Sequence, residues 1–336
     1  MHILKGYTKQ EISWMMYDWA NSAHSVIIVT LLPIFFDTVA GYTADSVSSM
    51  STWGYATSIA MLIVALAAPF LGVFGDIRGM RKKLFSFFML LGVAACAGMA
   101  FTPGMDFTSG PVAAGKVASL ILVLYIVSVI GFDASAIYYD AFLTDVATED
   151  RMDKVSTMGY GLGYIGGSTI PLLIFLIMNL VGVPMLTCLA FVFGLTAVWW
   201  LAFSLPLLKN CEQTSGKPYE KGDVARSIKG VGTTIKEIIA NKPMLIYILS
   251  YFFYIDGVHT VISMATTYGT NLGLDSTGMM LALLLVQILG LPFCLLYIKC
   301  SEKFGARTMV GFGICVYMFI CIFAFFMNSL WQFWML

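Results

Sequence analysis

Charged residues are scarce in this chain of 336 residues: they make up 11% of it, against about 25% in an ordinary soluble domain. With 59% of its residues hydrophobic, the chain is not a water-soluble globular enzyme. An excess of either charge is also missing, because 19 Lys and Arg residues balance 19 Asp and Glu residues. The chain therefore has no basic field to hold a nucleic acid and no acidic binding surface. The expected partner is the lipid bilayer.

Patterns of metal ligands and catalytic groups are missing as well. The three histidines, His2, His24 and His259, are too scattered for a zinc site, and the H-E-x-x-H motif does not occur. The seven cysteines have no paired spacing, which predicts packing residues rather than a disulfide or metal framework. No nucleophile, base or metal ligands cluster at one depth. We therefore expect no cofactor, no metal and no enzyme activity.

Two glycine patterns imitate nucleotide-binding motifs. Residues 110–116 spell G-x-x-x-x-G-K, but Val117 stands where Ser or Thr would hold magnesium. Residues 161–166 spell G-x-G-x-x-G inside an apolar run, without the strand that a dinucleotide fold requires. Glycines spaced by four in that run predict instead a smooth ridge for close helix packing: Gly159, Gly163 and Gly167.

Long apolar runs are what the chain does have, and about 20 residues suffice to cross a bilayer. Since the first run is as long as a full span and no cleavage site follows it, we interpret it as an uncleaved spanning helix. The chain is thus predicted to be an all-α integral membrane protein. Nine runs occur, near residues 14–36, 53–74, 84–103, 117–140, 156–179, 184–207, 244–268, 277–298 and 308–327, and a tenth begins at Trp331.

The positive charges predict the orientation. With the N-terminus in the cytoplasm, every Lys and Arg except Lys116 falls in a cytoplasmic segment, as the positive-inside rule requires. No Asn-x-Ser/Thr sequon occurs, which suits a prokaryotic inner membrane. The sixth connection, residues 208–243, separates a predicted N-terminal six-helix bundle, residues 1–207, from an incomplete C-terminal bundle, residues 244–336.

That sixth connection contains a helical pattern. Its apolar residues recur every three or four positions among lysines, which indicates an amphipathic helix on the inner membrane surface. A solvated linker with a helical stretch fits the pattern equally well. The apolar positions are Val224, Ile228, Val231, Ile235 and Ile238.

Polar residues recur at matching spacing in the first and seventh apolar runs. In the first run they occupy one face of a helix: Asp18, Asn21, Ser22 and Ser25. In the seventh run the same spacing gives Asp256, His259, Thr260 and Ser263. The pattern acidic-x-x-Gly-x-Arg also occurs twice, at residues 76–81 and 302–307. Together these correspondences favour duplicated halves, which are common in transporters.

Carboxylates inside apolar runs are functional candidates, because one at mid-bilayer costs on the order of 3 kcal/mol. Asp256 and His259, one helical turn apart, could form a proton-coupling or substrate-binding pair. Asp133, with Asp140 on the same face, is a further candidate. The alternative for each is a hydrogen bond to a neighbouring helix.

Several motifs resemble those of a transporter family. The signature G-x-x-x-D-x-x-G-x-[RK]-[RK] of the major facilitator superfamily is matched by Gly72, Asp76, Gly79, Arg81 and Lys82. Residues 17–23, YDWANSA, resemble the opening of the vacuole-effluxer-like branch, which includes autophagy-related permeases and bacterial relatives. Residues 139–143 resemble that branch's Y-N-A-F-L-P segment, with Asp140 in place of Asn and Thr144 in place of Pro. Residues 256–258 resemble its helix-seven D-G-V.

The resemblance implies twelve helices in two bundles, so a chain with nine is expected to be a member truncated at its C-terminus. In the superfamily, the carboxylate matching Asp76 pairs with a neighbouring Arg and the end of helix eleven, a lock that would be incomplete here. The implied cytoplasmic gate consists of Gly72, Asp76, Arg78, Gly79, Arg81 and Lys82. Characterised relatives resemble amino-acid effluxers of the vacuole.

The residues and the resemblance together predict a secondary active transporter of a small solute. We expect a monomer that works by alternating access, with the two polar stripes lining the solute's path and protons, or alternatively sodium, as the coupling ion. A non-transporting membrane receptor or scaffold is the alternative class. Only residues 208–243 could supply its docking surface.

Overall fold

The computed structural model describes residues 4–43, 46–216, 218 and 223–336 of the chain. Within these residues the regular structure is helical, and nine helical stretches are long and apolar enough to cross a membrane. The prediction of an all-α membrane protein with nine spans is confirmed. The chain divides into two units, Met1–Ile228 and Lys229–Leu336, and each is described by itself.

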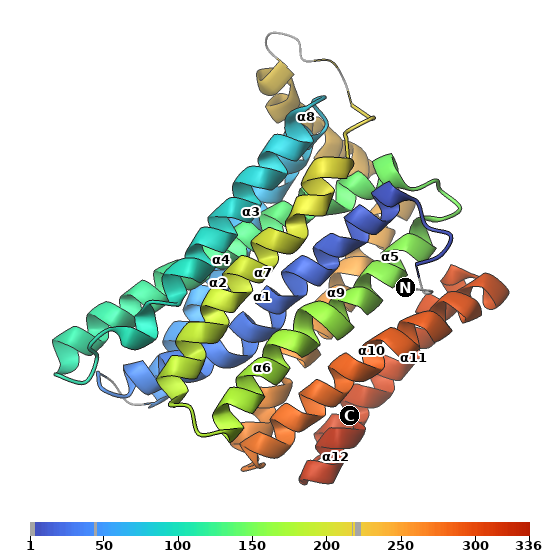
Figure 1. Cartoon of the computed structure of the whole chain (residues 1–336). Coiled ribbons are helices and arrows are strands. Elements are labelled where there is room, and N and C mark those ends of the chain that lie inside the picture. The colour runs from blue at the N-terminus through green and yellow to red at the C-terminus, as the bar shows by residue number, and fades with distance from the viewer. Residues whose placement is uncertain (1–3, 44–45, 217, 219–222) are drawn as a thin grey trace. The chain divides into compact units, whose positions relative to one another are not determined.

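The first unit contains six membrane-spanning stretches (Figure 1). The fifth stretch is built of three pieces, because a single turn of π-helix interrupts it. The elements are α1 (Lys9–Ala40), α2 (Ser46–Gly75), α3 (Met80–Met99), the 3-10 turn η1 (Thr102–Gly104), α4 (Pro111–Val146), α5 (Met152–Leu162), the π-helical turn η2 (Gly163–Ser168), α6 (Thr169–Leu180) and α7 (Met185–Asn210).

Helix α1 is the centre of this unit. It packs against α4, against the α5–η2–α6 stretch and against α7. It begins with a capping box, in which the Thr8 hydroxyl accepts from the Glu11 amide and the Glu11 carboxylate accepts from the Thr8 amide. Of its most apolar window, 56% is buried inside the protein. Residues of α1 therefore face protein on most sides, which allows polar side chains to be held at membrane depth.

Two glycines bring α3 and α4 into close contact. A side chain on Gly131 would collide with the backbone of Gly92 and with the Phe88 carbonyl oxygen. A side chain on Gly92 would collide with the ring of Trp200 from α7. Because both residues lack a Cβ, three helices approach one another closely, as small residues permit in membrane bundles.

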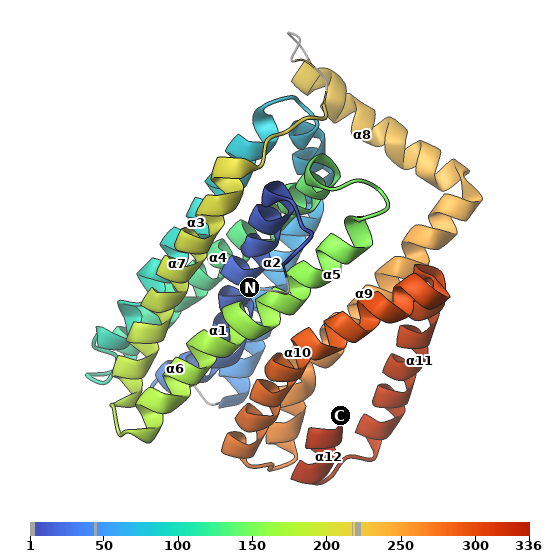
Figure 2. The ribbon, with the colours of Figure 1, turned by 45° about the vertical axis from the view of Figure 1, so that its right-hand side comes forward.

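The second unit is smaller and contains the remaining three spans. Its small buried core joins α10 to α12 and consists of Met279, Ala282, Met327 and Phe333. Helix α8 (Asp223–Ala240) includes the division between the units and joins α9 at a bend (Figure 2). The other helices are α9 (Lys242–Asn271), α10 (Ser276–Phe304), α11 (Ala306–Phe325) and α12 (Leu330–Met335).

Several helices are longer than the apolar runs that predicted them. Helix α4 has 36 residues, or about 54 Å at 1.5 Å per residue, whereas the hydrocarbon layer is about 30 Å thick. Hydropathy marks only the part of a helix in hydrocarbon, so the polar end of α4 that carries Asp145 lies outside the predicted span of residues 117–140.

Candidate transport and gating sites

Asp18 lies in the interior of the first unit, on α1. It is 7% exposed, and its Oδ2 accepts a hydrogen bond of 2.8 Å from the Tyr139 hydroxyl of α4. The ion pairs within the described residues do not include Asp18. A buried carboxylate with one hydrogen bond and no cation is costly to keep charged in an apolar environment. Asp18 is therefore the strongest candidate for a functional group in this unit.

Aromatic packing holds the Tyr139 hydroxyl, the donor to Asp18, in place. The Tyr139 ring stacks on Trp14, with centroids 4.3 Å apart, and the Trp14 indole donates a 2.8 Å hydrogen bond to the Tyr139 carbonyl oxygen. Tyr17 lies on another side of the Tyr139 ring, at 4.7 Å, and its own hydroxyl is 2.8 Å from the Ser135 hydroxyl. The segment of α1 around Asp18 thus supplies both the carboxylate and the rings that position its partner.

The predicted glycine ridge faces the same part of α1. A side chain on Gly159 would collide with the Asp18 carboxylate, and one on Gly163 would lie 3.1 Å from the Asp18 carbonyl oxygen. One on Gly167 would lie 2.8 Å from Ser22 Cβ. Two of the three glycines belong to η2, and π-helical turns inside α-helices are frequent at functional sites. The ridge therefore packs on the polar stripe of α1.

The rest of the α1 stripe is partly enclosed. Asn21 is buried, while Ser22 and Ser25 are half-buried, and the Ser25 hydroxyl donates to the Ser22 carbonyl oxygen at 3.0 Å. Next to the stripe lies His24, which the sequence analysis considered only as a metal ligand. It is buried, and its Nε2 is 3.3 Å from the Ser128 hydroxyl of α4.

The two further carboxylates of α4 have different surroundings. Asp133 is half-buried, and its buried Oδ2 has no hydrogen-bond partner within the described part of the chain. Asp140 is exposed. Their spacing of seven residues puts them about 10 Å apart along the helix. Asp133 therefore stays a candidate as a single group rather than as half of a pair.

The stripe predicted on the seventh run lies on α9 in the second unit. Asp256, His259 and Thr260 are exposed there, and the side chain of Ser263 lies outside the described residues. Gly257, next to Asp256, lines an open apolar groove of about 360 Å³ together with Tyr317 of α11.

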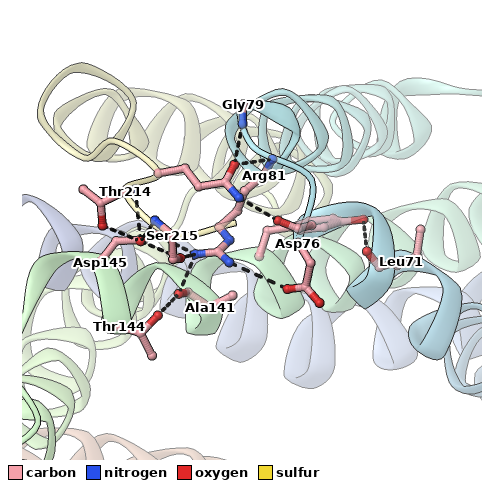
Figure 3. Close-up of polar contacts among 12 residues, drawn as sticks. Leu71, Asp76, Gly79, Arg81, Ala141, Thr144, Asp145, Thr214 and Ser215 are labelled. Atoms are coloured by element: carbon pink, nitrogen blue, oxygen red, sulfur yellow. Dashed lines mark hydrogen bonds and ion pairs between the residues drawn. The ribbon is translucent and has the colours of Figure 1, made fainter. Parts of the chain in front are cut away.

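The predicted gate motif lies at the turn between α2 and α3 (Figure 3). Arg81 is buried, forms an ion pair with Asp145 at the end of α4, and donates to the Ala141 carbonyl oxygen at 3.0 Å. The Asp76 side chain is 80% exposed and lies 3.9 Å from Arg81. Arg81 therefore pairs with two carboxylates, the exposed Asp76 and the buried Asp145. Asp76 lies in the exposed turn, whereas Arg81, in the first turn of α3, reaches α4.

The other residues of the motif are peripheral to this ion pair. Arg78 is exposed and Lys82 is half-buried. Gly79 has a φ of +81°, a value that glycine adopts without strain. A side chain on Gly72 would meet open space.

Residues 211–216, which we call the post-α7 segment, fold back onto the gate motif. The Gln213 amide oxygen accepts from the Gly79 and Arg81 backbone amides at 2.8 and 3.3 Å, and its nitrogen donates to the Gly75 carbonyl oxygen at 2.9 Å. Gln213 thereby supplies the acceptor that the N-terminus of α3 requires. The sequence analysis missed this role because 132 residues separate Gln213 from Arg81.

Asp145 joins the post-α7 segment to Arg81. Its Oδ1 accepts from the Thr214 amide and hydroxyl at 3.1 and 2.8 Å, and from the Ser215 amide and hydroxyl at 2.9 and 2.8 Å. Its Oδ2 pairs with Arg81. Asp145 was not predicted, although the adjacent Thr and Ser beyond α7 are a recognisable donor pair.

The start of the post-α7 segment is buried. Cys211 has no exposed surface, and its thiol donates to the Gln10 carbonyl oxygen at 3.6 Å. Burial raises the pKa of the Cys211 thiol to about 12. Glu11, the residue after Gln10, accepts two hydrogen bonds from Arg151, at 2.7 and 2.9 Å, and this pairing holds the pKa of Arg151 above its ordinary value.

Comparisons with known proteins agree with this architecture. The profile of the family described as vacuole effluxer Atg22 like matches residues 42–336. The chain is 39% identical over 342 residues to YxiO of Bacillus subtilis, described as an uncharacterized MFS-type transporter, and the match covers 99% of this chain and 77% of that protein.

More distant similarities extend to fungi and to a solved structure. Autophagy-related protein 22-1 of Penicillium rubens is 24% identical over 177 residues, a match that covers 49% of this chain and 30% of the relative. The inward-open structure of the xylose transporter XylE from E. coli superposes with a TM-score of 0.51 at 16% identity, covering 88% of this chain and 68% of that one. At this identity the superposition indicates the fold alone.

Proposed function

Because the chain belongs to the Atg22-like vacuole effluxer family of MFS-type transporters, we propose that it is a proton-coupled carrier of amino acids or related small solutes. Its relatives are transporters of the MFS type and are not enzymes. What we propose beyond this class is the solute, the coupling ion and the direction of transport. The family's description as vacuole effluxers supports efflux as the direction, and amino acids are the cargo that the resemblance implies.

The observation that carries the proposal is the uncompensated carboxylate of Asp18. In an apolar interior a carboxyl group either takes up a proton or meets a cation. Both events suit a carrier of amino acids, since the ammonium group of the solute could replace the proton at the same oxygen atoms. Tyr139, which donates to Oδ2 of Asp18, would hold the carboxylate in position in both states.

The test uses the full chain in proteoliposomes loaded with the pH-sensitive dye pyranine. Amino acids are added one at a time, and the internal pH reports any proton movement that accompanies the solute. We expect at least one amino acid to move protons in the wild-type chain, and Asp18→Asn to abolish that movement. Asp106→Asn, which changes an exposed carboxylate in the loop before α4, is the matched control.

The outcomes separate the candidate functions. Uptake of a labelled amino acid by Asp18→Asn, coupled to protons as in the wild type, would refute the role of Asp18. A solute that raises the thermal stability of the chain but never crosses the membrane would instead favour a receptor or scaffold.

A further inference from the structure

Helix α8 has one apolar side. Its described aliphatic residues recur at spacings of three and four, which place them on one face of the helix: Val231, Ile235, Ile238 and Ile239. Ile235 and Ile239 are 48% and 60% exposed. Thr233, Lys236 and Glu237 are exposed as well and occupy the remaining circumference. A helix with this pattern is stable where its apolar face has somewhere to be buried.

The joint between α8 and α9 places that helix beside a membrane. Only Asn241 separates the two helices, and α9 is a candidate span from its first residue, Lys242. The Asn241 backbone amide donates to the Glu237 carbonyl oxygen at 2.9 Å, and the Asn241 carbonyl oxygen accepts from the Leu245 backbone amide at 2.9 Å. Hydrogen bonds on both sides of the joint hold the end of α8 at the position where the chain enters the bilayer.

The charge around α8 fits an anionic surface. The connection of residues 208–243 contains seven Lys or Arg residues and four Asp or Glu residues, a net charge of +3. With 18 residues and this polarity, α8 is not among the candidate spans. Basic segments next to a span are attracted by anionic lipid headgroups.

We propose that α8 lies in the boundary between the headgroups and the acyl chains of the leaflet that faces the cation-rich segments. Ile235 and Ile239 enter the acyl region, and Lys236 remains among anionic headgroups. An amphipathic helix of this kind is buried about 5–10 Å into the boundary. The inference concerns a lipid surface, so it stands whether or not the proposed cargo and coupling ion are correct.

The first test measures depth with spin labels on the full chain in nanodiscs of phosphatidylcholine containing phosphatidylglycerol. Single cysteines replace Ile235, Ile239, Thr233 and Glu237 in turn, in a chain whose seven native cysteines are changed to serine or alanine. We expect labels at 235 and 239 to be accessible to oxygen, and labels at 233 and 237 to an aqueous nickel reagent. Accessibility to nickel at all four positions would overturn the proposal.

The second test needs no cysteine substitution. Hydrogen exchange of the native chain over residues 230–240 is compared in nanodiscs with and without phosphatidylglycerol, and we expect at least threefold slower exchange with the anionic lipid. Lys236→Gln should weaken this difference. Lys116→Gln, at an exposed lysine on α4, should leave it unchanged. Equal exchange in both lipids would overturn the anionic preference.

Discussion

Asp18 receives one hydrogen bond from a neighbouring helix, and that donor can be removed without changing the size of the core. In Tyr139→Phe the Asp18 carboxyl loses the Tyr139 hydroxyl, while the ring can keep its stacking on Trp14. We expect a loss of about 1–3 kcal/mol of stability and at least a tenfold loss of proton-coupled transport, measured by thermal unfolding in detergent and by pyranine.

The adjacent tyrosine is a matched control for this substitution. Tyr138 lies on the same helix, and its hydroxyl donates to the Leu71 carbonyl oxygen at 3.0 Å rather than to Asp18. Tyr138→Phe should therefore lower stability by a similar amount and leave coupled transport nearly intact. Equal transport by the two variants would contradict the role given to Tyr139.

A second prediction at the residue scale concerns the glycine ridge. In Gly163→Ala the new methyl group would meet the Ser22 hydroxyl and the Asp18 backbone, and overpacking of this kind costs about 1–3 kcal/mol. Gly54→Ala, on α2 with nothing within 4 Å, should be neutral or slightly stabilising. Denaturation of both variants in detergent would test the difference, and a wild-type midpoint for Gly163→Ala would argue against tight packing there.

The sequence identifies Asp18 and leaves Asp145 unnoticed for one physical reason. A carboxylate inside an apolar run is conspicuous, because burial without a purpose is costly. Asp145 is the last residue but one of α4, where charges are ordinary, and its partners come from distant segments. Only the fold brings Arg81, Asp145 and Ser215 together.

At the scale of elements, the post-α7 segment is held chiefly by side chains of two other helices. We expect Thr214→Ala with Ser215→Ala to raise the labelling rate of Cys211 by a water-soluble maleimide about tenfold. Asp145 loses two hydroxyl donors, which weakens the docking of the segment by at least about 1.4 kcal/mol. This free energy corresponds to a factor of about ten in the docking equilibrium. Cys211 is the reporter because its buried thiol, with a pKa of about 12, reacts slowly while the segment is docked.

The loop before α4 provides the control for this measurement. There Thr108 and Ser109 donate to Asp106 in the same way, within one loop. Thr108→Ala with Ser109→Ala should leave Cys211 labelling at the wild-type rate. Both pairs are compared in a chain whose other cysteines are replaced, and unchanged labelling in the Thr214 and Ser215 variant would show that the hydroxyl groups do not hold the segment.

Elements differ in how well the sequence predicts them. The nine spans follow from hydropathy, because each must satisfy its backbone within an apolar layer. The π-helical turn η2 cannot be predicted from hydropathy, because its glycines fit an ordinary α-helix equally well. The post-α7 segment lacks apolar periodicity, and its position depends on Asp145 and Gln213, which no local pattern connects.

For the whole molecule, the proposed coupling makes a prediction about Asp256. If protonation of Asp256 helps drive transport, Asp256→Asn should abolish uphill uptake of the amino acid found by the pyranine test and leave solute exchange within about twofold of the wild type. Asp150→Asn, at an exposed carboxylate, is the control. Unchanged uphill uptake by Asp256→Asn would assign coupling to other groups.

The π-helical turn also fixes how the distal half of its span is oriented. Such a turn accommodates one residue more than an α-helix of the same rise, and each residue rotates the chain by about 100°. Deleting one residue from Gly163–Ser168 would restore regular winding and rotate Leu172 and Phe175, which are 1% and 2% exposed, away from the protein interior. The extra residue therefore rotates the second half of the span about the helix axis relative to the first half. With this rotation, the apolar side chains of both halves face the bundle.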